Sequence, residues 1–285
     1  MSTEAFPQGN DRRPTETYPV MQRTGIRFFR RMSRVAYGNL REIGLRAFFI
    51  RDIMRAFADP ATYVPETFRQ MRNIGVDSIP LACIVAAFIG SVIALQVRYQ
   101  LFQGIQLSVV ALSVRQMIIL ELGPLLTGLV LTGRVGARMT AEIGTMRVTE
   151  QIDALETLAY DPIAYLVVPR LLASLVMLPV LTVFANVVGI TAGWLTAILA
   201  TDVMSVQFQE GLKLGFAPFQ VFYSLLKAVM FGGAIAIVCS YEGYITEAGA
   251  EGVGRSTAKA VVISSVVILT LDALTAALLA NQLAA

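Results

Sequence analysis

The feature that most constrains this chain is a set of unbroken apolar runs. A helix needs about 20 residues to cross a hydrocarbon core of roughly 30 Å. Of the 285 residues, 55% are hydrophobic and only 15% are charged, whereas about a quarter are charged in a typical soluble domain. The sequence therefore predicts an all-α integral membrane protein with five spans, at approximately 78–99, 116–135, 166–200, 221–240 and 258–280.

The third run, 166–200, is longer than one straight crossing requires. It contains Pro169 and Pro179, and a proline inside a helix removes a backbone donor and clashes with the preceding turn. Gly189 and Gly193 lie further along the same run. We expect a kinked, tilted helix with a lead-in on the cytoplasmic side.

The residues before the first span are polar or basic. Residues 1–20 contain three prolines and no apolar core, which predicts a flexible tail and not a cleavable signal peptide. Over 23–58, nine arginines alternate at helical spacing with aromatic and aliphatic residues. This pattern predicts a basic amphipathic interfacial region over 21–77 with a helix among lipid headgroups. An arm that binds nucleic acid is the alternative, and we favour the membrane surface.

Basic residues in the loops predict the orientation, because they stay preferentially in the cytoplasm. The N-terminal region and the stretches after the second and before the fifth span are basic, while the opposite loops hold little beyond Arg98, Arg115 and Lys213. We predict a multi-pass protein of a bacterial cytoplasmic membrane, with its N-terminus in the cytoplasm and its C-terminus in the periplasm.

Several kinds of chemistry are disfavoured by composition. The chain has no histidine, which removes Ser-His-Asp triads and the commonest zinc ligand. Its two cysteines, Cys83 and Cys239, both lie in apolar runs and are expected to be small packing residues and not a disulfide. We predict no metal, no cofactor and no enzymatic activity.

An apolar span runs directly into a polar segment over residues 121–162, with no turn signal before Asp161 and Pro162. Within 137–159, Arg138 with Glu142 and Arg147 with Glu150 or Gln151 have the spacing at which side chains meet on a helix. Met139, Ile143, Met146, Ile152 and Leu155 leave apolar contacts for a partner or for the protein's own spans. The segment predicts a cytoplasmic amphipathic helix able to couple a motor protein to the membrane helices.

Three sequence strings closely resemble the MlaE/YrbE family of ABC transporter permeases. They are ELGPLL from residue 121, GRVGARMTAEIGTMRVTEQIDALE from residue 133 and GAEGVGRSTAKAVV from residue 249. The resemblance extends from about residue 69 to the C-terminus. It implies a homodimeric subunit that moves lipid, with phospholipid favoured, in complex with a separate ATPase and an MCE-domain protein in the periplasm. On this basis, residues expected to couple to the ATPase are Glu142, Arg147, Glu150, Asp153 and Glu156.

A separate ATPase is also expected from the residues themselves. The sequence contains no GxxxxGK[ST] loop, and none of its lysines, Lys213, Lys227 and Lys259, follows a glycine. Since that loop holds nucleotide phosphates in such motors, ATP would be bound by the partner subunit.

Three charged residues, Glu121, Lys227 and Asp272, fall inside the predicted spans. A charge at membrane depth is costly and faces a cavity, an interface or a partner. In the resembling family, the positions of Glu121, Arg255 and Asp272 are thought to border the lipid path or brace the dimer. Structural hydrogen bonding is the alternative role.

Two further features of the second span bear on these roles. Many relatives have an arginine before the ELGP glutamate, where this chain has Leu120, and Arg115 lies more than one turn away. Glycines at 123, 128, 133 and 136 admit close helix approach, either within one subunit or at a dimer seam.

Two other functions remain open from the sequence. A membrane-embedded enzyme would need a nucleophile and base or a metal cluster, and no such constellation is visible. An ion-coupled carrier of a hydrophobic substrate could use Glu121 and Asp272 as proton sites, although paired broken helices are not evident.

Overall fold

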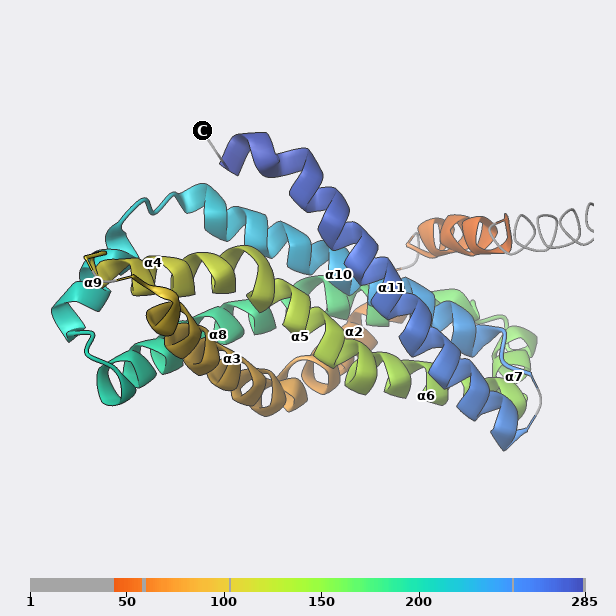
Figure 1. The fold of residues 1–285 in the computed structure, drawn as a ribbon. Helices are drawn as coiled ribbons and strands as arrows, with labels where there is room; N and C mark the ends of the chain where they lie inside the picture. Colours follow the sequence, from red (N-terminus) through yellow and green to blue (C-terminus); the bar gives the residue numbers. More distant parts are fainter. Residues whose placement is uncertain (1–43, 58–59, 103, 248, 284–285) are drawn as a thin grey trace, which may run out of the picture. The chain divides into compact units, whose positions relative to one another are not determined.

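The computed structural model describes residues 44–57, 60–102, 104–247 and 249–283, and all regular structure within them is helical (Figure 1). The chain forms two compact units, Met1–Phe48 and Phe49–Ala285. Of the first unit only residues 44–48 are described, and these are helical. The predicted tail and the interfacial region up to residue 43 therefore lie outside the described residues.

Five helical segments of the described chain are long and apolar enough to cross a membrane, which confirms the predicted fold class. They are Tyr63–Gln100, Ser108–Val148, Ile163–Ala200, Pro218–Tyr244 and Ala250–Leu278. Each overlaps one of the five predicted spans.

The helices within these segments have the following bounds. The first segment contains most of α2 (Pro60–Ile74), the 3-10 turn η1 (Val76–Ser78) and α3 (Ile79–Gln100). The second contains α4 (Ser108–Met117), η2 (Ile118–Leu122), α5 (Gly123–Leu131), η3 (Thr132–Gly136) and α6 (Ala137–Val148). The third contains η4 (Ile163–Val167) and α8 (Val168–Ala200), and the others are α10 (Pro218–Tyr244) and α11 (Ala250–Leu283). The connections contain α7 (Gln151–Thr157) and α9 (Ser205–Lys213).

The second segment is continuous but not uniformly α-helical. Its η2 and η3 turns are π-helical, and such turns occur mostly singly inside α-helices, frequently at functional sites. Glu121 lies in the first of these turns and Arg134 in the second.

Helix α8 runs unbroken from Val168 to Ala200. Pro169 lies directly after the π turn η4, near the start of α8, and Pro179 lies inside the helix. The lead-in predicted before the third span is the π turn η4. This helix packs against α2, α3, α5 and α10, and α10 also packs against α6 and α11.

Close backbone contact joins α3 to α8. A Cβ added to Gly90 would lie 1.9 Å from the carbonyl oxygen of Gly189, and one added to Gly193 would lie 3.0 Å from the carbonyl oxygen of Gly90. Small residues at such a contact allow helices to associate through backbone packing where lipid surrounds them. Gly189 and Gly193, expected to bend the third span, serve here in close packing.

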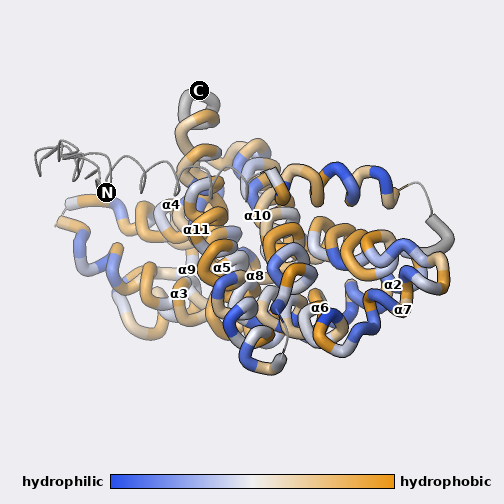
Figure 2. Tube along the Cα trace, turned by 90° about the vertical axis from the view of Figure 1, so that its right-hand side faces the viewer, coloured by the Kyte–Doolittle hydropathy of each residue, from blue (hydrophilic) through white to orange (hydrophobic). Residues whose placement is uncertain are grey.

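The long helices expose apolar side chains, as a lipid solvent permits. Phe88 and Val92 of α3 and Val187 and Leu195 of α8 are each more than half exposed. In Figure 2, hydrophobic residues follow the long helices and hydrophilic residues gather around α7 and the neighbouring turns.

Candidate functional site

Lys227 is the most completely buried charged side chain among the described residues. It lies on α10, about 14 Å along the helix axis from Pro218 at a rise of 1.5 Å per residue, and it has no exposed surface. Its Nζ lies 2.7 Å from Glu121 Oε2 and 2.8 Å from Asp272 Oδ1. It also donates to the carbonyl oxygen of Leu120 at 3.3 Å. One lysine therefore joins the second, fourth and fifth membrane segments.

Each helix brings its charged group to this point for a local reason. The π turn η2 places Glu121 and the carbonyl of Leu120 within reach of the same ammonium group. On α10, the ring of Tyr223, one turn before Lys227, lies with its centroid 4.7 Å from Nζ. A ring face at this distance attracts a cation. The ion pairs and the ring together compensate the burial of the lysine.

The cluster has unequal access to its surroundings. With both acids ionised, it holds two carboxylates and one ammonium group, and so carries a net charge of −1. The side chain of Glu121 is 43% exposed, whereas that of Asp272 is 16% exposed. Asp272 Oδ1 contacts Lys227 as an ion pair without a well-aligned hydrogen bond. Glu121 is therefore the member that a molecule from outside can reach most easily.

Further polar groups lie near Glu121. Asn186 on α8 donates from Nδ2 to Ser224 Oγ on α10 at 3.2 Å. A Cβ added to Gly123 would lie 1.9 Å from Asn186 Oδ1, so the amide touches the backbone next to the π turn. Asn186 Oδ1 and the hydroxyl of Tyr223 are buried without a hydrogen-bond partner in the described protein. The cluster thus has unused hydrogen-bonding capacity.

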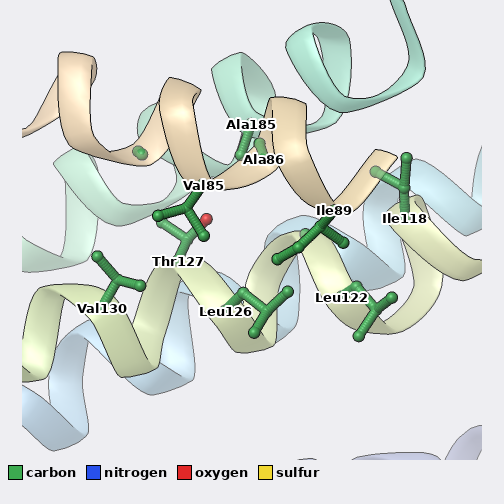
Figure 3. A pocket seen from close by; sticks show the side chains of 11 residues that line it. Val85, Ala86, Ile89, Ile118, Leu122, Leu126, Thr127, Val130 and Ala185 are labelled. Atoms are coloured by element: carbon green, nitrogen blue, oxygen red, sulfur yellow. The ribbon is translucent and has the colours of Figure 1, made fainter. Parts of the chain in front are cut away.

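An apolar cleft lies between α3, the second segment and α8 (Figure 3). Ile118, Leu122 and Gly123, from or beside the turn that carries Glu121, line it together with Val85 and Ile89 of α3. Thr127 contributes the only side-chain oxygen among its lining residues. The cleft is suited to hydrocarbon and unsuited to a polar solute.

The structure does not bring Arg255 into this cluster. Arg255 lies in the first turns of α11 and forms an exposed ion pair with Glu247. Asp272 is on the same helix but more than four turns away, so the two residues cannot share a site directly. Of the four predicted lipid-path or dimer-seam residues, Glu121, Lys227 and Asp272 meet and Arg255 does not.

The polar segment after the second span contains two helices, and the prediction of one helix over 137–159 was wrong. Helix α6 ends at Val148 and α7 begins at Gln151, with Glu150 between them in a left-handed conformation (φ 58°). The hydroxyl of Thr149 binds the carbonyl of Thr145 at 2.8 Å. Such side-chain bonds, together with the β-branched pair Val148 and Thr149, disfavour continuation of the helix.

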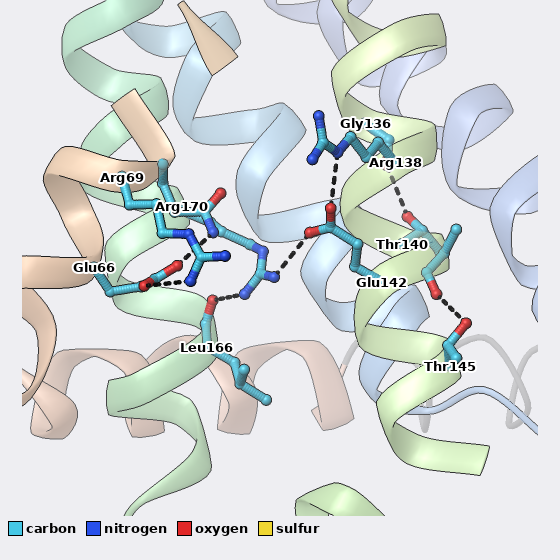
Figure 4. Close-up of polar contacts among 11 residues, drawn as sticks. Glu66, Arg69, Gly136, Arg138, Thr140, Glu142, Thr145, Leu166 and Arg170 are labelled. Carbon is cyan, nitrogen blue, oxygen red and sulfur yellow. Dashed lines mark hydrogen bonds and ion pairs between the residues drawn. The ribbon is translucent and has the colours of Figure 1, made fainter. Parts of the chain in front are cut away.

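The predicted coupling residues divide into two groups. Glu142 faces the protein: it accepts from Arg138 Nε at 2.8 Å and from Arg170 Nη2 at 3.1 Å (Figure 4). Arg147 binds Asp153 at 2.6 Å and not the predicted Glu150 or Gln151. Because the helix breaks between α6 and α7, Glu150 and Gln151 do not lie on the same helix face as Arg147.

The outer face of α7 remains exposed. Glu150, Asp153 and Glu156 are exposed there, and Leu158 and Tyr160 are exposed beyond its end. Met139, Ile143 and Ile152, for which a partner was one option, are buried in the protein's own core. The exposed surface is therefore acidic with an apolar edge.

The four glycines predicted to admit close helix approach differ in what surrounds them. A Cβ on Gly123, Gly128 or Gly136 would meet Asn186, Phe231 or Cys239 of the same chain, whereas Gly133 has open space. Packing within one subunit accounts for three of them. Cys83 and Cys239 are both free thiols.

Sequence reasoning missed the roles of two arginines. Arg115 is buried and donates to the carbonyl oxygens of Leu212, Leu214 and Gly215 at the end of α9. Arg170 is buried beside Glu142 and also donates to the carbonyl oxygen of Leu166. An arginine next to Pro169 at the start of an apolar run was a signal that could have identified the second.

The sequence matches a protein family described as Permease MlaE over residues 67–278. It is 40% identical to a probable ABC transporter permease protein of Rickettsia prowazekii, over 80% of this chain and 88% of the relative. It is 42% identical to a probable ABC transporter permease protein of Synechocystis, over 70% and 75%. It is 29% identical to the intermembrane phospholipid transport system permease protein MlaE of Haemophilus influenzae, over 87% and 95%.

Proposed function

Because this chain belongs to the MlaE family of ABC transporter permeases, we propose that it moves phospholipid between the cytoplasmic membrane and a periplasmic MCE-domain partner, driven by a separate ATPase. The family consists of transport subunits and not of enzymes. The relative in Haemophilus influenzae is named for phospholipid transport between membranes. The proposal extends that substrate class to this protein, in a homodimer with ATP bound by the partner subunit.

The observation that carries the proposal is that the turn bearing Glu121 of the Lys227 charge cluster also contributes residues to the apolar cleft. A phospholipid has a charged headgroup and hydrocarbon chains, so a path for it must offer both environments. Glu121 supplies an accessible carboxylate, and the same turn of the second segment lines the cleft. Lys227 and Asp272 compensate each other behind it.

Orientation is part of the proposal. Basic residues around α6 and in the first turns of α11 favour a cytoplasmic location for these ends, with α9 and the C-terminus on the periplasmic side. The exposed face of α7, with Glu150, Asp153 and Glu156, then faces the cytoplasmic ATPase. Arg147 and Asp153 tie α7 to α6, and α6 continues the span that carries Glu121, so force on α7 has a direct route to the cluster.

The first experiment tests transport itself. Proteoliposomes with the purified complex are supplied either with ATP or with a proton gradient alone, and transfer of labelled phospholipid is measured. We expect transfer with ATP only. Transfer with the gradient alone would favour the ion-coupled carrier instead. Asp272→Asn keeps shape and hydrogen bonding and should retain part of the activity, while Asp272→Leu should lose it.

The second experiment tests the coupling surface. Reversing the charges at Glu150 and Asp153 to lysine should weaken co-purification of the ATPase and its stimulation by the permease, while insertion in the membrane is unchanged. A matched control is Glu210→Lys, because Glu210 lies on α9 in a different connection and is exposed. Unchanged association and transport in the Glu150 and Asp153 variant would remove α7 from this role.

A further inference from the structure

A second cleft lies between α2 and the segment formed by η3 and α6. Its lining includes Arg134 and Arg138 from the second segment and Gln70 and Asn73 from α2. None of these residues belongs to the Lys227 cluster. The cleft is therefore a separate feature from the proposed transport path.

Arg134 and Arg138 lie one helical turn apart and are both exposed. Arg134 Nη1 donates to Ser78 Oγ at 2.8 Å and to the carbonyl oxygen of Asp77. Both acceptors are uncharged, and Arg134 forms no ion pair with a carboxylate of the described chain. Among the described residues, the guanidinium of Arg138 donates one hydrogen bond, from Nε to Glu142. Each guanidinium therefore keeps donors free for another acceptor.

The charge around the cleft is positive. Glu142 is the one carboxylate that lines it, and this group is shared by Arg138 and by the buried Arg170 behind it. On α2, Glu66 accepts from Gln70 and pairs with Arg69, so these neighbours balance each other (Figure 4). Two arginines and one carboxylate line the cleft, and the buried Arg170 behind Glu142 adds a further positive charge, so arginines outnumber carboxylates here by two.

The cleft lies where apolar helices give way to polar residues, which is the position expected for a headgroup layer. Ser78, which Arg134 contacts, immediately precedes the apolar helix α3. Arg134 and Arg138 lie where the second segment changes from apolar to polar. Beneath them, the buried side chains of Ile74, Val135 and Met139 form an apolar floor. Guanidinium groups above apolar side chains complement a phosphate above the first carbons of a lipid.

We propose that this cleft binds the headgroup phosphate of an anionic phospholipid, at a site separate from the proposed transport path. Arginine suits this ligand because its planar fork can donate two hydrogen bonds to one phosphate. The excess charge favours an anionic over a zwitterionic headgroup. A lipid there would also touch α2 and α6 together, beside the contact that Arg134 of η3 makes with Asp77 of η1. The inference does not depend on which lipid is transported.

The test uses the full chain, purified in mild detergent and mixed with equal amounts of phosphatidylglycerol and phosphatidylcholine of the same acyl chains. Native mass spectrometry then measures the ratio of the two bound lipids. We expect phosphatidylglycerol to dominate, and the double variant Arg134→Gln with Arg138→Gln to reduce the ratio by roughly tenfold or more. Arg69→Gln is the control: it removes one positive charge from α2, outside the cleft, and should leave the ratio nearly unchanged.

A second variant covers the case in which loss of Arg134 impairs folding. Asn73→Asp adds a carboxylate to the cleft without touching the contacts of Arg134, and it should lower the same ratio. An unchanged ratio in both variants would overturn the proposal, as would an equal loss in Arg69→Gln. Displacement of the lipid by inorganic phosphate alone would show a free-phosphate site instead. Loss of ATPase binding with an unchanged lipid ratio would show a protein-docking surface, which also contradicts it.

Discussion

Replacing Lys227 by methionine should destabilise this protein strongly, although methionine is apolar and fits a membrane interior. The substitution removes the one ammonium group between Glu121 and Asp272, whose carboxylate oxygens lie 2.7 and 2.8 Å from Nζ. Removing one partner of a buried ion pair costs about 3–5 kcal/mol, because the remaining charge is left without compensation.

The exposure of the two acids sets where in that range the loss should fall. On the proposed transport path, Glu121, which is 43% exposed, would be solvated once it is free, whereas Asp272, which is 16% exposed, would be solvated much less. We therefore count one stranded carboxylate and not two, and expect a loss of about 3 kcal/mol in the free energy of unfolding.

Unfolding by SDS in mixed micelles, followed by circular dichroism, measures this change. The control is the triple variant Lys227→Met, Glu121→Gln and Asp272→Asn, which keeps the shapes of the acids and leaves no charge. Its stability should exceed that of Lys227→Met alone, because neutral amides cost less to bury than a lone carboxylate. If Lys227→Met unfolds like the original protein, or if the triple variant is no more stable than the single one, the charges do not compensate each other as described.

Three further predictions concern other contacts. Gly90→Val should lower stability by several kcal/mol and disturb α3 against α8, since its Cβ would lie 1.9 Å from the carbonyl oxygen of Gly189; unfolding in mixed micelles measures it. Arg115→Met should cost about 2–3 kcal/mol, because carbonyl oxygens at the end of α9 lose a charged donor, and proteolysis of this connection should accelerate. The hydrogen bond from Arg98 lowers the pKa of the Asp202 carboxyl. This ion pair therefore stabilises the folded protein above the ordinary carboxyl pKa, and the stabilisation is lost as the pH falls through the lowered pKa of Asp202. Asp202→Asn should abolish this loss of stability at acid pH, as measured by thermal unfolding.

Glu121, Lys227 and Asp272 could be identified from the sequence, because each is a charged residue inside a predicted apolar span. The sequence was not enough to show that all three meet. The π turn η2 changes the angular register of the second segment, so a regular helical pattern does not give the direction of Glu121.

In the polar segment after the second span, spacing along the sequence predicted contacts within one helix but not contacts with distant segments. Local spacing predicted the pair Arg138 with Glu142 correctly, because both residues lie within one helix. It could not show that Glu142 is also held by Arg170, which is 28 residues away in the chain. Likewise, the acceptors of Arg115 are backbone carbonyls, which no side-chain pattern marks. Contacts made within a turn or two were predictable, and contacts between distant segments were not.

The two π turns of the second segment also affect how this chain tolerates change in length. A π turn holds one residue more than an α turn, so deleting one residue inside η2 or η3 can be absorbed by conversion to ordinary α-helix, with the faces of the helix beyond it preserved. The same deletion inside α5 would rotate everything that follows by about 100°, turning Arg138 and Glu142 away from α2 and α8. Length variation in this span should therefore be confined to 118–122 and 132–136, where a shortened chain can still fold although the geometry at Glu121 or Arg134 changes.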